Sequence, residues 1–556
     1  MILKKRLAAW ALAALMGMSL LTGCGGDKPA EGKTEGTETE QSGETGAPVE
    51  GAVVRHNLSV DPATIDPALN SAVDGAVVLS NLFEGLCRTD ANDKAIPGIA
   101  EKWEVSEDGL HYTFHLREAK WSDGEILKAG DFEYAWKRAL APETAAEYAY
   151  QLYYLANGEK YNSGEGTADE VGVKAVDDKT LEVTLQDPTP YFLELTAFPT
   201  YFPVRKDIVE KDPEKWALDP ATLISNGPFK LAEWKHNDVM KLVKNENYYD
   251  AGVVKLAGVD FFMITEETTG LAAFENGELD YTEPVPQAKI PVLKQEGNEN
   301  FFIRPYLGTY FYVFNVTAKP VDDVKVRQAL TLAIDRTAIV EKVSQGGQQQ
   351  ANGFVPAGMP THDGKSFREF AGDYGIPATA DVEKAKALLA EAGYPNGEGF
   401  PSVTLYYNTL ESHKAIAEAV QEMWKQNLGI TVELQNEEWK VFQERRNNLD
   451  FTIARHGWIA DYADPMNFLE MWLSGSGNNN SGWKSAEFDK LVADSKAASG
   501  AERDEIMKQA EKLMMEEYIT CPIYYYTLPC MVNPKLKDVQ MSALGFVFYR
   551  EAYITE

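Results

Sequence analysis

Arg455-His456-Gly457-Trp458-Ile459-Ala460-Asp461-Tyr462-Ala463-Asp464-Pro465 is the most informative segment of this chain. It places a guanidinium, an aromatic ring and a carboxylate close together, and Gly457 lets another backbone approach. A free peptide carries an ammonium at one end and a carboxylate at the other. Asp461 is suited to the ammonium and Arg455 to the carboxylate. The alternative is a surface loop with a structural ion pair, so the rest of the chain must decide between the two.

The whole chain is long enough for several domains. Its 556 residues exceed what one hydrophobic core supports, which predicts two or three domains. Hydrophobic residues make up 44% and charged residues 25%, as is typical of globular proteins. A formal net charge of -32 disfavours nucleic acid as a partner.

The N-terminus is expected to be a targeting signal. Lys4-Lys5-Arg6 precedes an apolar run, residues 7–20, that is short for a membrane-spanning helix. The run ends at Leu21-Thr22-Gly23-Cys24, which is similar to a bacterial lipobox. Residues 1–24 are therefore expected to be a lipoprotein signal peptide with lipidation on Cys24, the alternative being an ordinary secretory signal. Residues 25–50 lack aromatic residues and are rich in Gly and Glu, which predicts a disordered acidic tether.

Three cysteines follow Cys24, namely Cys87, Cys521 and Cys530. An odd number excludes full pairing within the chain. Cys521 and Cys530 flank the strand-like segment 522–526, which would hold them apart if straight, but their pairing stays open at this point.

Strand and helix patterns alternate along the chain. Residues 112–116 alternate like a half-buried strand, and residues 173–185 are typical of a hairpin. Asp131 is expected to be the N-cap of a helix that ends at Leu140. The later part predicts helices at 323–335, 382–392 and 412–427 and strands at 403–408 and 430–434. This alternation favours an α/β lobe.

Motifs of enzymes and metal sites are missing or incomplete. His111 and His115 share a face of the predicted strand but lie roughly 13 Å apart, too far to bind one ion. The glycine-rich runs 346–347 and 475–482 lack the lysine of a phosphate loop, and no Gly-x-Ser-x-Gly occurs. We therefore expect a protein without catalytic residues, metal or cofactor.

Several segments occur together in one order along the chain: Asp61–Pro67, Asn81–Leu86, Pro97–Trp103, Thr113–Arg117, Trp121–Gly124, Ala129–Phe132, Asn226–Phe229 and Val326–Leu330. In this order they resemble the bacterial extracellular solute-binding proteins of the peptide/nickel group, family 5. Four further segments make the chain most similar to the oligopeptide-binding members that serve ABC importers: Pro305–Tyr312, Glu438–Lys440, Arg455–Pro465 and Cys521–Tyr526. The resemblance covers the chain from about Val53 to its C-terminus.

The resemblance implies an α/β fold with two lobes, of the periplasmic-binding-protein type (class II). It also implies an extra domain, mixed β-sheets and a ligand cleft between the lobes. The implied core domain of lobe 1 comprises residues 51–74, 206–306 and 528–556, the extra domain residues 75–205, and lobe 2 residues 307–527. The implied partners are an oligopeptide and the transmembrane subunits of an ABC permease. The implied protein is a monomer, anchored through Cys24 to the outer face of the cytoplasmic membrane.

The resemblance also implies which residues contact the ligand. Asp461 falls where a carboxylate binds the ligand ammonium, and Arg455, Arg446 and His413 fall where side chains meet the ligand C-terminus. The backbone at 457–459 and 306–309 would pair with the peptide main chain. The complete expected set is Asp461, Arg455, Arg446, His413, Asp61, Trp439, Trp458, Gly457, Tyr148, Tyr310 and Tyr525.

Some alternatives remain open. Asp461 could be a structural acid, Arg446 a solvated charge, and His413 a residue that belongs to a helix cap. A well-known enteric member has a disulfide where this chain has Gly308 and Ile459, so that bridge is missing here. The cargo could instead be a dipeptide, murein peptide, haem or nickel chelate. A peptide-sensing receptor and an envelope hydrolase are further alternatives.

Overall fold

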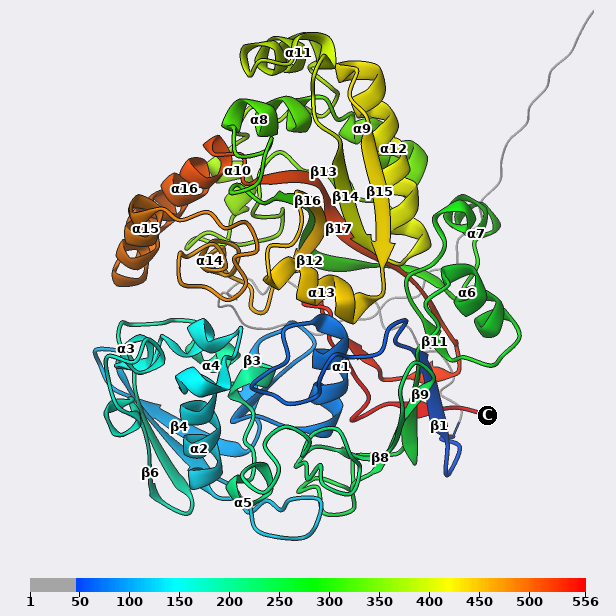
Figure 1. Cartoon of the computed structure of the whole chain (residues 1–556). Coiled ribbons are helices and arrows are strands. Elements are labelled where there is room, and N and C mark those ends of the chain that lie inside the picture. Colours follow the sequence, from blue (N-terminus) through cyan, green and yellow to red (C-terminus); the bar gives the residue numbers. More distant parts are fainter. Residues whose placement is uncertain (1–46) are drawn as a thin grey trace, which may run out of the picture. The chain divides into compact units, whose positions relative to one another are not determined.

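The computed structural model describes residues 47–556 (Figure 1). The predicted signal peptide, the lipidation site Cys24 and nearly all of the predicted tether lie outside the described residues.

The main sheet has eleven strands, ordered β15-β14-β16-β12-β17-β11-β1-β10-β9-β8, with β13 beside β17. It is mixed, as predicted, since β1 runs parallel to β10 whereas β12 and β17 are antiparallel. The strands are Val53–Asn57 (β1), Phe229–Lys235 (β8), Val239–Lys244 (β9), Gly258–Phe262 (β10), Tyr281–Thr282 (β11), Phe301–Phe314 (β12), Gln349–Gln350 (β13), Val403–Asn408 (β14), Val432–Glu437 (β15), Ile453–Ile459 (β16) and Thr520–Val532 (β17).

Two long strands connect the two ends of this sheet. β12 pairs with β17 over Phe301–Pro305 and again over Thr309–Val313, with a register shift between the two stretches. Beyond the shift β12 also pairs with β16, whereas the other end of β17 pairs with β11. The predicted lobe boundary 306/307 lies between these two stretches, and the boundary 527/528 lies beside the shift, within the first stretch.

A second sheet, ordered β4-β5-β7-β6, lies within the predicted extra domain. Its strands are Ala100–Val105 (β4), His111–Leu116 (β5), Val173–Asp177 (β6) and Thr180–Thr184 (β7). The predicted strand at 112–116 and the hairpin at 173–185 are thus confirmed. Three two-stranded sheets complete the strands, formed by Cys87–Thr89 (β2) with Ala95–Pro97 (β3), Leu536–Lys537 (β18) with Tyr553–Ile554 (β21), and Gln540–Met541 (β19) with Val547–Phe548 (β20).

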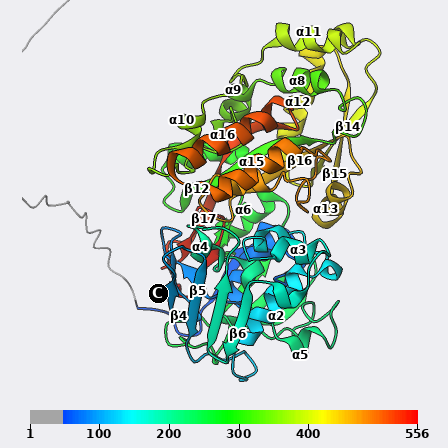
Figure 2. The same cartoon turned by 90° about the vertical axis from the view of Figure 1, so that its left-hand side faces the viewer.

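The helices are Val73–Leu82 (α1), Ala129–Leu140 (α2), Gly158–Asn162 (α3), Phe192–Leu195 (α4), Lys206–Val209 (α5), Glu267–Glu275 (α6), Ile290–Glu296 (α7), Val324–Leu332 (α8), Arg336–Ala338 (α9), Phe367–Ala371 (α10), Val382–Glu391 (α11), Glu411–Leu428 (α12), Trp439–Asn447 (α13), Met466–Glu470 (α14), Ala486–Ala497 (α15) and Gly500–Glu516 (α16). α15 and α16 lie side by side (Figure 2).

Two helix predictions need correction. The N-cap of α2 is Lys128, not Asp131, because Asp131 lies in the first turn and its carboxylate accepts a hydrogen bond from Lys128 N at 2.9 Å. The helix predicted over 323–335 ends at Leu332, since Asp335 caps the separate short helix α9. α12 ends at Gly429, whose φ of 72° lies in the left-handed region that favours glycine.

Cys521 and Cys530 both lie on β17, where they face Tyr312 and Phe302. They are buried and free, as is Cys87, so the question of a bridge between them is settled. Gly308 and Ile459 face each other across β12 and β16. Within residues 47–556, no helix has both the length and the apolar character needed to cross a membrane.

Candidate ligand-binding site

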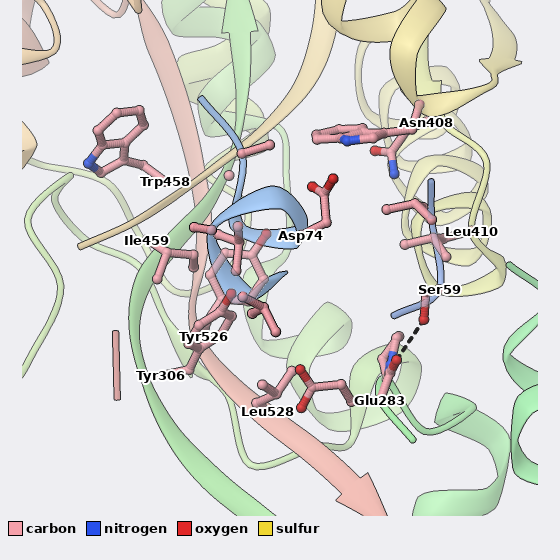
Figure 3. Close-up of a pocket in the computed structure, with 18 of the residues that line it drawn as sticks. Ser59, Asp74, Glu283, Tyr306, Asn408, Leu410, Trp458, Ile459, Tyr526 and Leu528 are labelled. Atoms are coloured by element: carbon pink, nitrogen blue, oxygen red, sulfur yellow. Dashed lines mark hydrogen bonds between the residues drawn. The ribbon is translucent and has the colours of Figure 1, made fainter. Parts of the chain in front are cut away.

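A cavity of about 330 Å³, counted as the space that the centre of a water molecule can occupy, lies beside the long strands (Figure 3). Residues of predicted lobe 1, including α1, line one wall, and residues of α12, α13, β16 and β17 line the other. Cavities of this size bind small molecules and short peptides. Eight of the eleven predicted residues line it: Tyr148, His413, Trp439, Arg446, Arg455, Gly457, Trp458 and Asp461.

Asp461 lies just past the end of β16 and binds only neutral groups of the described chain. Its Oδ2 accepts hydrogen bonds from Gln151 Nε2 at 2.8 Å and Asn467 Nδ2 at 2.9 Å, and the Tyr148 hydroxyl lies 3.4 Å from Oδ1. Burial raises the pKa of Asp461 to about 8, and the charge of Glu470 adds to the rise. These donors orient the carboxylate but supply no positive charge, so a cationic ligand group would complete the site.

Trp458 and Asn467 fix the position of Asp461. Asn467 Oδ1 accepts hydrogen bonds from both Trp458 Nε1 at 2.9 Å and Asp461 N at 3.1 Å. The Trp458 ring also stacks on Tyr148, with centroids 6.1 Å apart and planes 11° from parallel. The aromatic residue of the motif therefore supports the carboxylate from behind, and Trp458 is 5% exposed.

Arg455 lies earlier on β16, and its guanidinium forms no ion pair with a carboxylate of the described chain. Its guanidinium donates to the Tyr526 hydroxyl at 2.6 Å and to Asn408 Oδ1 at 3.4 Å. It also lies 4.9 Å from the centre of the Tyr310 ring. These groups position the guanidinium and leave its charge available for an anionic ligand group.

Arg446 lies on α13, and its side chain forms no hydrogen bond within residues 47–556, although the residue is only 7% exposed. Its guanidinium lies 5.8 Å and 5.2 Å from the rings of Trp439 and Phe442. Burial, with the neighbouring charge of Arg455, lowers its pKa to about 9. Burial likewise holds the pKa of His413 well below its usual range, so that its ring is neutral.

The backbone of β16 presents an open edge beyond its contact with β14, which pairs only with Ile453 and Ala454. Ala460 N donates to Leu307 O on β12, and hydrogen-bonded pairs alternate along an antiparallel ladder. Ala460, directly after β16, is thus one of the residues that hydrogen-bond to β12, and Gly457 and Ile459 are not. The N–H and C=O groups of these two residues are therefore directed away from β12. This edge can pair with an extended chain, in which case the Gly457 N–H exchanges its contact with His456 Nδ1, at 2.8 Å, for the ligand.

Three predicted residues do not line the cavity. Asp61 instead accepts hydrogen bonds from Trp234 Nε1 at 2.9 Å and from Asn237 N at 3.1 Å. Tyr310 is fully buried behind Arg455. The Tyr525 hydroxyl binds backbone at 352–353, on the opposite face of β17.

Sequence reasoning missed several lining or supporting groups. Tyr526 could have been found, because residues 524 and 526 share one face of a strand and 525 takes the other. Gln151 and Asn467 carry no signal in the sequence, since they reach Asp461 from separate segments. Asp74 was also missed, and its carboxylate projects from α1 into the cavity (Figure 3).

Comparisons with known proteins identify the family of the chain. Residues 94–480 match the family described as bacterial extracellular solute-binding proteins, family 5 Middle. The Bacillus subtilis oligopeptide-binding protein OppA is 42% identical over 510 residues, covering 89% of this chain and 92% of that protein. The dipeptide-binding protein DppE of the same organism is 39% identical over 543 residues, 97% of each chain.

Solved structures of similar proteins allow the fold and the degree of opening to be compared. Haemophilus influenzae OppA in complex with RPPGFSPFR has a TM-score of 0.87 at 33% identity, over 92% of this chain and all of that one. The Escherichia coli murein tripeptide-binding protein MppA scores 0.86 at 34% identity, over 92% of this chain and all of that one. Its unliganded open form, with 92% of this chain and 99% of that one covered, scores 0.61. The expected fold is thereby confirmed, and the chain belongs to the bacterial extracellular solute-binding proteins of family 5.

Proposed function

We propose that this protein binds oligopeptides in the cavity and delivers them to the transmembrane subunits of an ABC importer. The observation that carries this proposal is that one cavity holds both an acidic and two basic side chains, none of which has a partner of opposite charge in the described chain. Asp461 meets only neutral donors, and Arg446 and Arg455 meet no carboxylate of the described chain. A peptide with free termini supplies both missing charges.

The peptide main chain is held by the open edge of β16. Hydrogen bonds to the backbone at 457–459 hold any sequence equally well, so specificity is left to the pockets around the side chains. Water fills the space that smaller side chains leave. This division explains how one site can accept many peptides.

Closure of the two lobes traps the ligand. β12 and β17 both cross between the predicted lobes and both change register near Pro305, so this is where we place the hinge. The TM-score is 0.86 for the first MppA structure and 0.61 for its unliganded open form, which supports a less open arrangement of this chain than in that form.

The proposal is tested by titration calorimetry with alanine peptides of graded length, each with free, N-acetylated or C-amidated ends. Asp461→Ala and N-acetylation should each weaken binding by about 2–5 kcal/mol, as when one partner of a buried charge pair is removed. Unchanged affinity in both cases would refute the proposed role of Asp461. Graded length also distinguishes a dipeptide site, the activity named for DppE, from an oligopeptide site.

Transport, rather than catalysis or sensing alone, is the expected outcome of binding. Peptides incubated with the purified protein should remain intact by mass spectrometry, which tests the envelope hydrolase. Uptake of labelled peptide by cells with and without the protein separates import from signalling. The proposed monomer and the lipid anchor on Cys24 are tested by light scattering and by mass spectrometry of the mature N-terminus.

A further inference from the structure

The carboxylate of Asp74 is a charge in the cavity that peptide termini do not explain. Asp74 lies in the first turn of α1, and its Oδ2 is buried without a hydrogen-bond partner. Within residues 47–556 no lysine, arginine or histidine forms a salt bridge with it. Burial accordingly raises the pKa of Asp74 to about 7.

The other carboxylates that line the cavity are already engaged. Glu283 pairs with Arg304 at 3.0 Å, and Glu147 accepts a hydrogen bond from Asn447 at 2.6 Å. Asp461 has the network of neutral donors that orients it for an ammonium. Asp74 alone among these four has neither an ion pair nor a hydrogen bond of good geometry from another side chain of the described chain.

The surroundings of Asp74 suit a long cationic side chain. Trp439 and Leu410 line the same cavity and offer aromatic and aliphatic surface to a methylene stem. The Trp439 indole N–H is near enough to lower the pKa of Asp74 slightly, yet it forms no hydrogen bond of good geometry. The carboxylate projects into open space, with Asn408 and Leu410 on one side and Ile459 on the other (Figure 3).

The formal charge of the residues that line the cavity also favours a cationic side chain in the ligand. Four carboxylates (Asp74, Glu147, Glu283 and Asp461) and two guanidiniums (Arg446 and Arg455) line it, a difference of two negative charges with the histidines neutral. Arg304 offsets Glu283 from outside the lining. A peptide with two free termini is neutral overall and leaves the remaining excess in place, whereas a basic side chain reduces it.

We propose that Asp74 is a specificity-determining residue that selects peptides with a lysine or arginine side chain at one position. The inference rests on the proposed function and names a ligand class within it. The side-chain cation forms an ion pair with the Asp74 carboxylate, and its stem packs on Trp439. The selected position is the one whose side chain is directed toward α1.

The experiment measures affinity by calorimetry at pH 8 for alanine peptides in which each position in turn is lysine or norleucine. One position should favour lysine by about tenfold, equivalent to 1.4 kcal/mol. Asp74→Asn should reduce that ratio to near one. Asp61→Asn is the matched control, because Asp61 is a nearby carboxylate outside the cavity, and it should keep the preference.

The outcomes separate the two proposals. If alanine peptides bind but no position favours lysine, or if the preference survives Asp74→Asn, the inference about Asp74 is wrong and the peptide site stands. If no peptide binds at all, both fail together. A thermal unfolding midpoint for each variant shows that a lost preference is not a lost fold.

Discussion

Glu267 and Ser412 join two helix N-termini that belong to different predicted lobes. Glu267 Oε1 accepts hydrogen bonds from Ser412 N at 3.2 Å and from the Ser412 hydroxyl at 2.5 Å. The contact is reciprocal, since Glu411 accepts hydrogen bonds from Thr268 N at 3.3 Å and the Thr268 hydroxyl at 2.9 Å. Each helix, α6 and α12, thus receives an acidic cap from the other.

Loss of this mutual cap should favour the open form of the protein. Glu267→Ala removes two hydrogen bonds that exist only when the helices meet, so peptide affinity should fall by about 1–3 kcal/mol although Glu267 is not among the residues that line the cavity. Small-angle scattering should show a larger radius of gyration for the ligand-free variant. Glu266→Ala, an exposed neighbour, is the control. Equal affinities for the two variants would show that the contact does not contribute to closure.

The sequence was most informative where chemistry is local. The order of motifs predicted the family and fold, and the 455–465 segment contains two of the charged groups of the site, Arg455 and Asp461. Strand 403–408 was predicted with the bounds that β14 has, because a strongly alternating pattern leaves little freedom.

Contacts between distant segments could not be predicted in this way. Gln151 and Asp461 are hydrogen-bonded although 310 positions separate them in the sequence. Asp74 lines the cavity because the fold places α1 at its wall. Asp61 does not line the cavity, because a matching motif gives a position in the chain but not the direction of its side chain. The start of α2 was misjudged because a lysine, Lys128, occupies the N-cap position, while Asp131 reaches back from the first turn to the Lys128 backbone N–H.

Replacing Asp461 should make the ligand-free protein more stable at high pH. The pKa of Asp461 is about 8 in the folded protein and about 3.8 in an unfolded chain, so folding favours the protonated form. The stability contributed by this group is complete below pH 3.8 and is lost as pH rises through 8. Asp461→Asn should therefore raise the unfolding midpoint at pH 9. At pH 5 the difference should largely vanish, and a difference of equal size there would contradict the burial of this charge.

Peptide binding should release a proton below pH 8. The ligand ammonium requires ionised Asp461, whose carboxylate is mostly protonated in the ligand-free protein at lower pH. Affinity for alanine peptides should then weaken by up to about tenfold per pH unit as pH falls from 8. Calorimetry in buffers of different ionisation enthalpy measures the proton directly. Asp461→Asn should abolish the release, and its persistence in that variant would assign the proton to another group.

Arg446→Leu should separate stability from binding. Arg446 is buried beside Arg455 without a counter-charge in the described chain, so a leucine there removes an unpaired buried charge and should raise the unfolding midpoint. Peptides whose C-terminus reaches Arg446 should bind more weakly, and C-amidated versions should be affected much less. Arg445→Leu is the contrasting variant. Arg445 forms an ion pair with Glu437 at 2.7 Å, so the loss of its charge should lower the unfolding midpoint of the protein.

Gly457→Ala tests the position of Arg455 and Tyr526 in the cavity. A Cβ at this position would lie 2.4 Å from the Tyr526 hydroxyl and 3.1 Å from Arg455 Nη2, both at the ends of side chains that can move. The fold should therefore tolerate the methyl group, but Arg455 and Tyr526 must move from the positions that they hold in the cavity, so affinity for peptides should fall by about tenfold, or 1.4 kcal/mol. Gly252→Ala, where nothing lies within 4 Å of the added atom, is the control and should bind normally. C-amidated peptides, which offer Arg455 no carboxylate, should lose less affinity, and an equal loss would show that the displaced guanidinium is not what weakens binding.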